Sequence, residues 1–231
     1  MSAFTERTRA GAVATDADGA PPGGPAMHRA GMPQDMRRLL RRATQRYHDR
    51  LDAASVLAPL LLPQVTLAEY RTAMLAMLCT YGRVDACLSQ QPRAACAAEI
   101  NVEVVAPYRA RSPAMQHDLR AMGIEPEPGS PQAAVTLDDP PDMPTYFGMR
   151  YVIEGAQFGN RVIGRNLQAA FGTAADDICT AWQPCARTDD GWASVMAALS
   201  ALETRRDVAA ALRGARLTFR YFVANLCVPP R

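Results

Sequence analysis

The sequence lacks most of the patterns that assign a function directly. It has no run of about 20 apolar residues, which excludes a membrane-spanning helix and a membrane partner. The signatures GxGxxG, GKS or GKT, GxSxG and HExxH are all missing. With three histidines and no ExxH pair, a His-rich metal centre is excluded and a di-iron bundle finds no support. A Ser or Cys nucleophile with a His partner stays open, because only folding brings such partners together.

Cysteine spacing and charge exclude further classes. The six cysteines form no CxxC pair and no zinc-type spacing with histidine. Residues 1–30 lack the apolar run of a signal peptide, so we expect free thiols in the reducing cytoplasm. The 25 basic and 23 acidic residues give a net charge of +2, which argues against nucleic acid as a partner. The basic residues are arginine rather than lysine, a bias that a GC-rich genome explains equally well.

What the sequence does contain favours helices. Alanine and leucine, both helix formers, dominate a composition that is 48% hydrophobic and 21% charged. Residues 1–33 are rich in Ala, Gly and Pro, and we predict a disordered tail there. From residue 34 to 228 we predict one all-α domain, a bundle of about seven helices. The expected helices cover roughly 36–51, 67–89, 92–108, 112–122, 146–171, 189–203 and 206–226.

The first motif is the stretch Leu40–Leu51, which follows helical spacing and contains His48. A lone helical histidine is usually a surface or core residue, but a neutral imidazole is also an axial ligand for haem iron. Arg41 lies two turns earlier on the same face, where a guanidinium could meet a haem propionate. A solvated helix face is the alternative for Arg41.

The second motif is the glycine-rich stretch Gly148–Gly164. Gly155 and Gly159 are four residues apart and share one helix face. Each costs about 1 kcal/mol relative to alanine inside a helix. That cost is accepted where the backbone closely approaches another group or where the helix bends. Tight helix–helix packing and a flat ligand against the backbone are both consistent with this spacing.

Four blocks in order resemble the haem oxygenase family, most closely its bacterial branch that supplies biliverdin to phytochromes. The block 40–51 resembles the family's proximal helix, with His48 at the iron-ligand position. The block 151–167 resembles its distal helix. The blocks 111–123 and 215–219 resemble its R-S-x-x-L-x-x-D-L-x-x-L-G and A-x-x-T-F segments. Together they span roughly residues 36–226.

The resemblance implies the haem oxygenase helical bundle, with haem held between the helix of His48 and a kinked distal helix. Gly155 and Gly159 would let the distal backbone approach the haem and steer bound O₂ towards one meso carbon. The resemblance also implies that His117 lies outside the pocket, in solvent. The expected catalytic residues are Gly155, Gly159 and Asn160, and the expected cofactor-binding residues are His48, which also ligates the iron, Arg41, Phe158 and Phe219. Core packing is the alternative for the two phenylalanines.

The implied reaction opens haem with O₂ and electrons to biliverdin, CO and ferrous iron, with haem as both substrate and prosthetic group. The implied partners are haem, O₂, an external electron donor such as a ferredoxin or a flavoprotein reductase, and a phytochrome that receives biliverdin. Four arginines of the first helix are candidates for docking an acidic donor, with a solvated helix face as the alternative: Arg37, Arg38, Arg41 and Arg42.

Two departures from the family pattern motivate alternatives. Relatives often carry glycine where this sequence has Asn160, and many carry an aspartate where it has Ala156. Asn160 and Gln157 are candidates for a replacement water network. A haem carrier or sensor without turnover is therefore the alternative function, and a scaffold of this fold without haem is a third.

Overall fold

The computed structural model describes residues 32–90, 105–126, 137, 141–183 and 188–227, and within these ranges the regular elements are all helical. The all-α class expected from the sequence is therefore confirmed. The described residues belong to one compact unit. None of the described helices is both long enough and apolar enough to span a membrane. The helices are α1 (Met32–Ala54), α2 (Leu67–Leu88), α3 (Ser112–Ala121), α4 (Met143–Gly155), α5 (Gln157–Phe171), α6 (Ala175–Ile178), α7 (Thr188–Ser200) and α8 (Arg205–Leu226).

Several predicted boundaries differ from the observed ones. The tail predicted over 1–33 lies outside the described residues up to residue 31, and α1 begins at Met32. Of the helix predicted over 92–108, only residues 105–108 are described, and they are not helical. The single helix predicted over 146–171 is two helices, α4 and α5, which are separated at Ala156. The sequence marked this segment as weak through its glycines, but it did not locate the break.

Capping residues explain where several helices begin. Thr66 accepts a hydrogen bond from the backbone N–H of Glu69, and the Glu69 carboxylate accepts one from the N–H of Thr66. This capping box satisfies two backbone donors at the start of α2. Asp142 caps α4 and Thr204 caps α8 in the same way, each through a backbone N–H three residues later.

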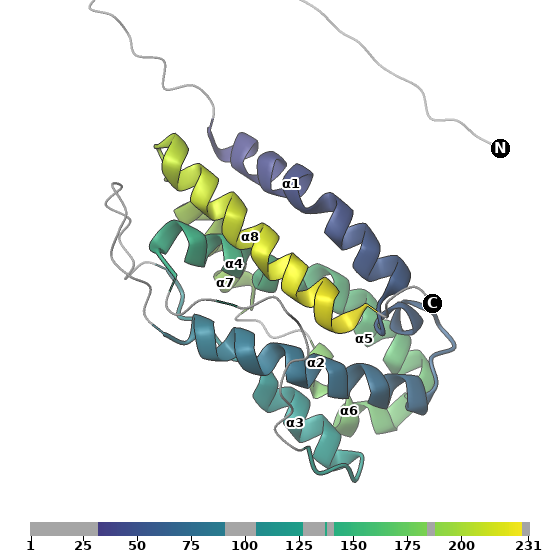
Figure 1. The fold of residues 1–231 in the computed structure, drawn as a ribbon. Coiled ribbons are helices and arrows are strands. Elements are labelled where there is room, and N and C mark those ends of the chain that lie inside the picture. The colour runs from purple at the N-terminus through teal and green to yellow at the C-terminus, as the bar shows by residue number, and fades with distance from the viewer. Residues whose placement is uncertain (1–31, 91–104, 127–136, 138–140, 184–187, 228–231) are drawn as a thin grey trace, which may run out of the picture. The chain divides into compact units, whose positions relative to one another are not determined.

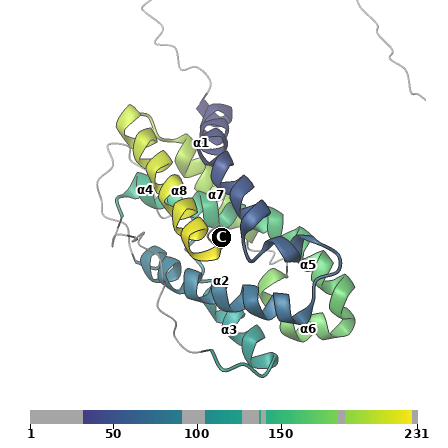
Figure 2. The ribbon, with the colours of Figure 1, turned by 45° about the vertical axis from the view of Figure 1, so that its right-hand side comes forward.

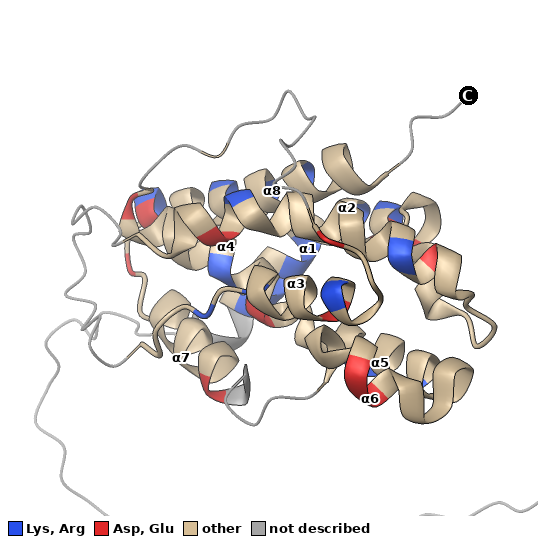
Figure 3. Cartoon of the chain, turned by 90° about the horizontal axis from the view of Figure 1, so that it is seen from below, with Lys and Arg blue, Asp and Glu red and all other residues tan. Residues whose placement is uncertain are grey.

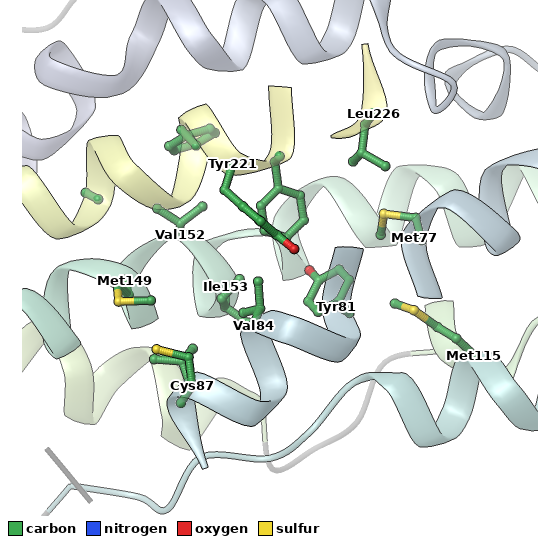
Figure 4. Packing of buried hydrophobic residues seen from close by; sticks show 14 of the residues in the cluster. Met77, Tyr81, Val84, Cys87, Met115, Met149, Val152, Ile153, Tyr221 and Leu226 are labelled. Atoms are coloured by element: carbon green, nitrogen blue, oxygen red, sulfur yellow. The ribbon is translucent and has the colours of Figure 1, made fainter. Parts of the chain in front are cut away.

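Helices α1 and α8 run side by side and in the same direction (Figures 1 and 2). The Nε of Arg216 donates to the carbonyl of Ala43, and an isolated bridge joins Ser55 to Cys227 at the C-terminal ends of both helices. On its other side α8 packs against α4. The buried core extends through α2, α3, α4 and α8, as the side chains drawn in Figure 4 illustrate.

Two glycines allow α4 and α8 to touch through their backbones. A Cβ atom on Gly148 would clash with the carbonyl group of Ala211, and one on Gly214 would clash with the carbonyl group of Thr145. Both clashes involve backbone atoms, which cannot rotate away as a side chain can. Tight helix packing, one of the two explanations left open for this glycine-rich stretch, therefore accounts for Gly148.

We expect Gly148→Ala to lower the free energy of unfolding by about 1–3 kcal/mol, because the new methyl group overpacks the contact between α4 and α8. The matched control is Gly82→Ala in α2, where a Cβ would meet no atom within 4 Å. That control should gain about 0.5–1 kcal/mol from helix propensity alone. Urea unfolding of both variants measures the difference. Equal stability of the two variants would contradict the close packing.

Candidate functional site

One cavity of about 440 Å³ lies between α1, α8 and the broken pair α4–α5, with α2 and α7 completing its wall. This volume is within the range of small-molecule and cofactor pockets, about 300–1,000 Å³. The cavity brings together residues from parts of the sequence more than 170 positions apart. All seven residues predicted for the site line it: Arg41, His48, Gly155, Phe158, Gly159, Asn160 and Phe219.

The imidazole of His48 lines the cavity. Its partner is the carboxylate of Asp52, which lies one turn later on α1. Nδ1 of His48 lies 3.0 Å from Oδ2 of Asp52, with 59% and 54% of the two side chains exposed. The imidazole ring is 6.2 Å from the ring of Phe219 on α8. An Nδ1–H that faces the carboxylate leaves the lone pair on Nε2. Metal-ligating histidines usually have this arrangement, with a carboxylate on the nitrogen that does not bind the metal.

The N-terminal half of α1 makes one end of the cavity basic. Arg37 and Arg41 both line it, one helix turn apart, and the guanidinium of Arg37 lies 5.9 Å from the Trp192 ring centroid. Tyr151 faces the same two arginines. Burial raises the pKa of Tyr151, and the positive charges of Arg37 and Arg41 oppose this shift. This end is therefore suited to binding carboxylate groups of a ligand.

The two glycines of the distal motif have different environments. A Cβ on Gly155 would lie 3.2 Å from Cζ3 of Trp192, so the missing side chain accommodates the indole ring. A Cβ on Gly159 would meet no atom within 4 Å, although Gly159 lines the cavity. Close packing thus accounts for Gly155. At Gly159 the absent side chain leaves the α5 backbone accessible from the cavity.

Aromatic side chains form much of the remaining wall. Phe158 is 46% exposed and meets the edge of Trp192, with ring centroids 5.3 Å apart. Phe222 packs edge-to-face on Tyr81 at 5.1 Å. Trp192 contacts three parts of the wall, at Gly155, Tyr151 and Phe158, so α7 holds the α4–α5 break in place from outside. An apolar wall of this kind shields a flat hydrophobic ligand from water.

A buried polar cluster lies behind the cavity. Glu154 accepts hydrogen bonds from Arg150 and Arg111, both at 2.8 Å, and its side chain is 3% exposed. Asp85 accepts bonds from the backbone N–H of Arg111 and from the Tyr108 hydroxyl. These contacts tie α2, α4 and the start of α3 together next to the cavity.

Two further polar side chains, those of Tyr81 and Gln157, belong to helices that line the cavity. Tyr81 lines the cavity, and burial raises the pKa of its hydroxyl while the charge of Arg111 opposes the shift. Gln157 is 8% exposed, and neither polar atom of its carboxamide has a partner among the described residues. Buried amides of this kind usually hold ordered water. Asn160 lines the cavity itself, whereas Gln157 does not.

The residues present fit a haem. A haem iron needs one axial imidazole, and His48 lies in the cavity with its Nδ1 already paired. The two propionates of a haem match the paired arginines, and the porphyrin matches the aromatic wall. In the described ranges no three His, Cys, Asp or Glu side chains gather as a metal site formed by protein alone. His117 is exposed and does not line the cavity, as expected.

The comparisons with known proteins agree with this fold. No family model matches the chain. A haem oxygenase from Xanthomonas campestris pv. campestris (strain 8004) is 32% identical over 130 residues, which cover 54% of this chain and 72% of that protein. Among solved structures, haem oxygenase from Neisseria meningitidis has a TM-score of 0.59 at 21% identity, covering 82% of this chain and 89% of that one. Haem oxygenase from Leptospira interrogans has a TM-score of 0.54 at 14% identity, covering 80% and 95%.

The helical fold and its cavity thus define an all-α protein with the architecture of haem oxygenases. The chain belongs to the haem oxygenase family. The family expected from the four sequence blocks is confirmed. Its assignment to the branch that supplies phytochromes, and the roles of the individual site residues, stay predictions.

Proposed function

We propose that this protein is an enzyme that opens haem, with O₂ and electrons, to biliverdin, CO and ferrous iron. The observation that carries the proposal is the cavity itself, which has the imidazole of His48 on α1 and the accessible backbone at Gly159 on α5. Haem bound there is substrate and prosthetic group, and it supplies the oxygen chemistry. The protein binds, orients and shields it.

His48 would hold the iron through Nε2. The carboxylate of Asp52 beside Nδ1 fixes the tautomer and limits rotation of the exposed ring. Arg37 and Arg41 would hold the propionates at the other end of the same helix face. Because these two contacts lie along one helix, they set the position of the porphyrin in its plane. That position determines which meso carbon faces α5.

The distal side would work mainly through its backbone. Gly159 leaves the helix backbone accessible, and neighbouring Ala156 adds only a methyl group. Phe158 and Trp192, in contact edge-to-face, would cover part of the porphyrin on this side. Asn160 is the polar side chain of α5 that lines the cavity, and we assign to it the positioning of a proton-donating water. The unpaired amide of Gln157 provides a second water-binding position behind it.

The remaining participants follow from the reaction. Electrons would come from a ferredoxin or a flavoprotein reductase, since the sequence carries no flavin or nicotinamide motif. A phytochrome is a candidate acceptor of the biliverdin. The cytoplasm is the proposed compartment, because its electron carriers and reduced thiols suit this chemistry.

A haem carrier or sensor without turnover is the second candidate. The observation that favours it is that Asp52 is the sole carboxylate among the described cavity-lining residues, and it is already paired with His48. The distal wall therefore offers no acid to deliver protons directly. Water held by Asn160 must replace it if the protein is an enzyme.

Incubation of the ferric haem complex with ascorbate in air distinguishes the two functions. The enzyme is expected to lose its Soret band while a biliverdin spectrum appears. The CO released in the reaction should be captured by a CO trap over the same time. An Asn160→Ala variant should bind haem normally but turn over about 100-fold more slowly, the lower end of what a positioned proton donor contributes, because Asn160 acts through a water. A stable Soret band in the wild-type complex would support the carrier instead.

A further inference from the structure

A second cavity, of about 520 Å³, lies along one face of α5. Four residues of α5 line it, and their spacing of three and four positions places them on one side of the helix: Arg161, Gly164, Arg165 and Gln168. Its other walls come from α6 and from η4 (Thr180–Trp182) with the residues beside them. We call it the second cavity, and the one described above the haem cavity. Trp182 lines both of them.

The second cavity has an apolar floor and a polar rim. Ala175, Cys179 and Trp182 are buried beneath it. The polar side chains of α5 that line it are exposed, as is Gln183. A Cβ atom on Gly164 would lie 3.1 Å from the carbonyl oxygen of Trp182, so the missing side chain lets α5 approach the floor closely. A ligand with a flat apolar body and charged side chains fits such a surface.

The charge at the rim is positive. Arg161 and Arg165 are the charged side chains that line the second cavity among the described residues, and no described carboxylate lines it. The neighbouring α6 carries Asp176 and Asp177, which are exposed but do not line the cavity, and Figure 3 shows this acidic segment in red beside α5. Arg165 donates through Nε to the carbonyl of Arg161, which leaves its terminal nitrogens to meet a ligand. Guanidinium groups in this arrangement favour carboxylates.

This arrangement repeats two features of the haem cavity. In the haem cavity, Arg37 and Arg41 lie four residues apart on α1. In the second cavity, Arg161 and Arg165 lie four residues apart on α5. The haem cavity has a volume of about 440 Å³, so the second cavity is no smaller. A site of this size and charge is suited to another molecule of the same class, a tetrapyrrole with two carboxylate side chains.

The second cavity differs from the haem cavity in its lack of an iron ligand. Among the described residues, no histidine lines it. Burial raises the pKa of the Cys179 thiol to about 11, so the thiol stays protonated, and only a thiolate binds metal well. The lining instead includes the carboxamides of Gln168 and Gln183. Gln168 donates to the carbonyl of Gly172, which leaves its own oxygen to accept a hydrogen bond from a ring N–H.

We propose that the second cavity binds a linear, metal-free tetrapyrrole that carries two carboxylates. This rests on the proposed function, because the product biliverdin belongs to that class. The terminal lactam rings of such a molecule offer the N–H and C=O groups that carboxamides recognise, and haem has no lactam. The carboxylates would meet Arg161 and Arg165, and the pyrrole rings would lie on the floor that contains the indole of Trp182.

The position of the second cavity suits a product that has just been formed. Trp182 belongs to the walls of both cavities. The guanidinium of Arg161 lies 5.9 Å from the ring centroid of Phe158, which lines the haem cavity. Product held in the second cavity stays on the protein without occupying the site of the iron. The haem cavity can then take up the next haem before the linear tetrapyrrole is released.

The test uses the complex with ferric hemin, which is not converted as long as no electrons are supplied. The probe is biliverdin, titrated into this complex and followed by its induced circular dichroism in the red, where hemin absorbs weakly. The Soret band of the same samples shows whether hemin stays bound. The test variant carries Arg161→Ser and Arg165→Ser. The control variant carries Arg109→Ser and Arg120→Ser, which remove the same charge from exposed positions that line neither cavity.

We expect the wild-type hemin complex to bind about one biliverdin, with an unchanged Soret band. Loss of the charged hydrogen-bond donors should raise the biliverdin Kd of the test variant by about tenfold or more. The control variant should stay within about twofold of wild type, because salt screens exposed charges at a distance. Absence of an induced signal, equal biliverdin affinity of the two variants, or loss of hemin when biliverdin is added would each overturn the proposal.

Two further titrations distinguish other ligands of the same charge. Succinate or inorganic phosphate in excess should not displace biliverdin from the hemin complex, and an added second equivalent of hemin should not displace it either. Displacement by succinate or phosphate would mean that the second cavity is a general anion site. Displacement by hemin would mean that the cavity does not select a metal-free, linear tetrapyrrole. Either result would overturn the proposal.

The second cavity and the proposed function can fail separately. If the wild-type complex does not open haem with ascorbate, the proposed activity is wrong. The titration with added biliverdin is made without ascorbate, so it still decides what the second cavity binds. If hemin does not bind at all, the free protein is used for the same comparison of the two variants. If haem is opened but biliverdin binds only when hemin leaves, the activity stands and the proposal for the second cavity is wrong.

Discussion

His48→Ala is expected to abolish the histidine-ligated haem spectrum and to lower haem turnover by more than about 100-fold. Loss of a residue that merely supports a metal ligand typically costs about 10–100-fold, and loss of the ligand itself should exceed that. Among the described residues, no second histidine lines the cavity to replace it. Titration with hemin, followed through the Soret band, and the rate of biliverdin formation with ascorbate measure the two effects.

His117→Ala is the matched control, because His117 is exposed and lies away from the cavity. It should bind and open haem like wild type. Imidazole added to His48→Ala should restore the ligated spectrum by filling the space that the side chain leaves. If His48→Ala kept the wild-type spectrum and rate, the iron would have another ligand and the assignment of the site would be wrong.

Glu154→Gln is expected to be the most destabilising of the conservative substitutions, costing about 3–5 kcal/mol. The carboxylate compensates Arg150, whose side chain is 2% exposed, and also binds Arg111. A glutamine keeps the shape but leaves the buried guanidinium without a counter-charge, and breaking a buried ion pair in this way is costly. Urea unfolding measures the loss. The dependence of the unfolding free energy on urea concentration should be the same in wild type and variant, so that the two free energies can be compared.

Glu125→Gln provides the comparison, because Glu125 pairs with Arg120 where the two side chains are 79% and 54% exposed. Exposed pairs contribute about 0–1 kcal/mol. We therefore expect a difference of at least about 2 kcal/mol between the two variants. A Glu154→Gln variant as stable as Glu125→Gln would mean that the cluster behind the cavity does not hold α4 in place.

The sequence was sufficient for the fold class and for seven of the residues that line the cavity. Helical periodicity and capping residues such as Thr66 depend on local sequence, so they can be read without a structure. His48 and Gly159 were identified by ordered blocks that resemble a known family, and the structure brings them to one cavity. The break at Ala156 was not located, because weak helix positions occur throughout that segment.

The residues that the sequence did not reveal depend on long-range contacts. Glu154 and Arg111 are 43 positions apart, and Trp192 reaches the cavity from α7 to contact Gly155. No local pattern records such pairings. Asp52 is different, because its four-residue spacing from His48 on one helix was visible in the sequence. A search for a carboxylate one turn from the candidate ligand would have found it.

A crystal structure of the hemin complex tests the central claim most directly. We predict that Nε2 of His48 binds the iron, that the propionates meet Arg37 and Arg41, and that the distal face of the porphyrin lies along α5 at Gly159. Iron held by any other side chain, or a porphyrin bound outside the space between α1 and α5, would contradict this account.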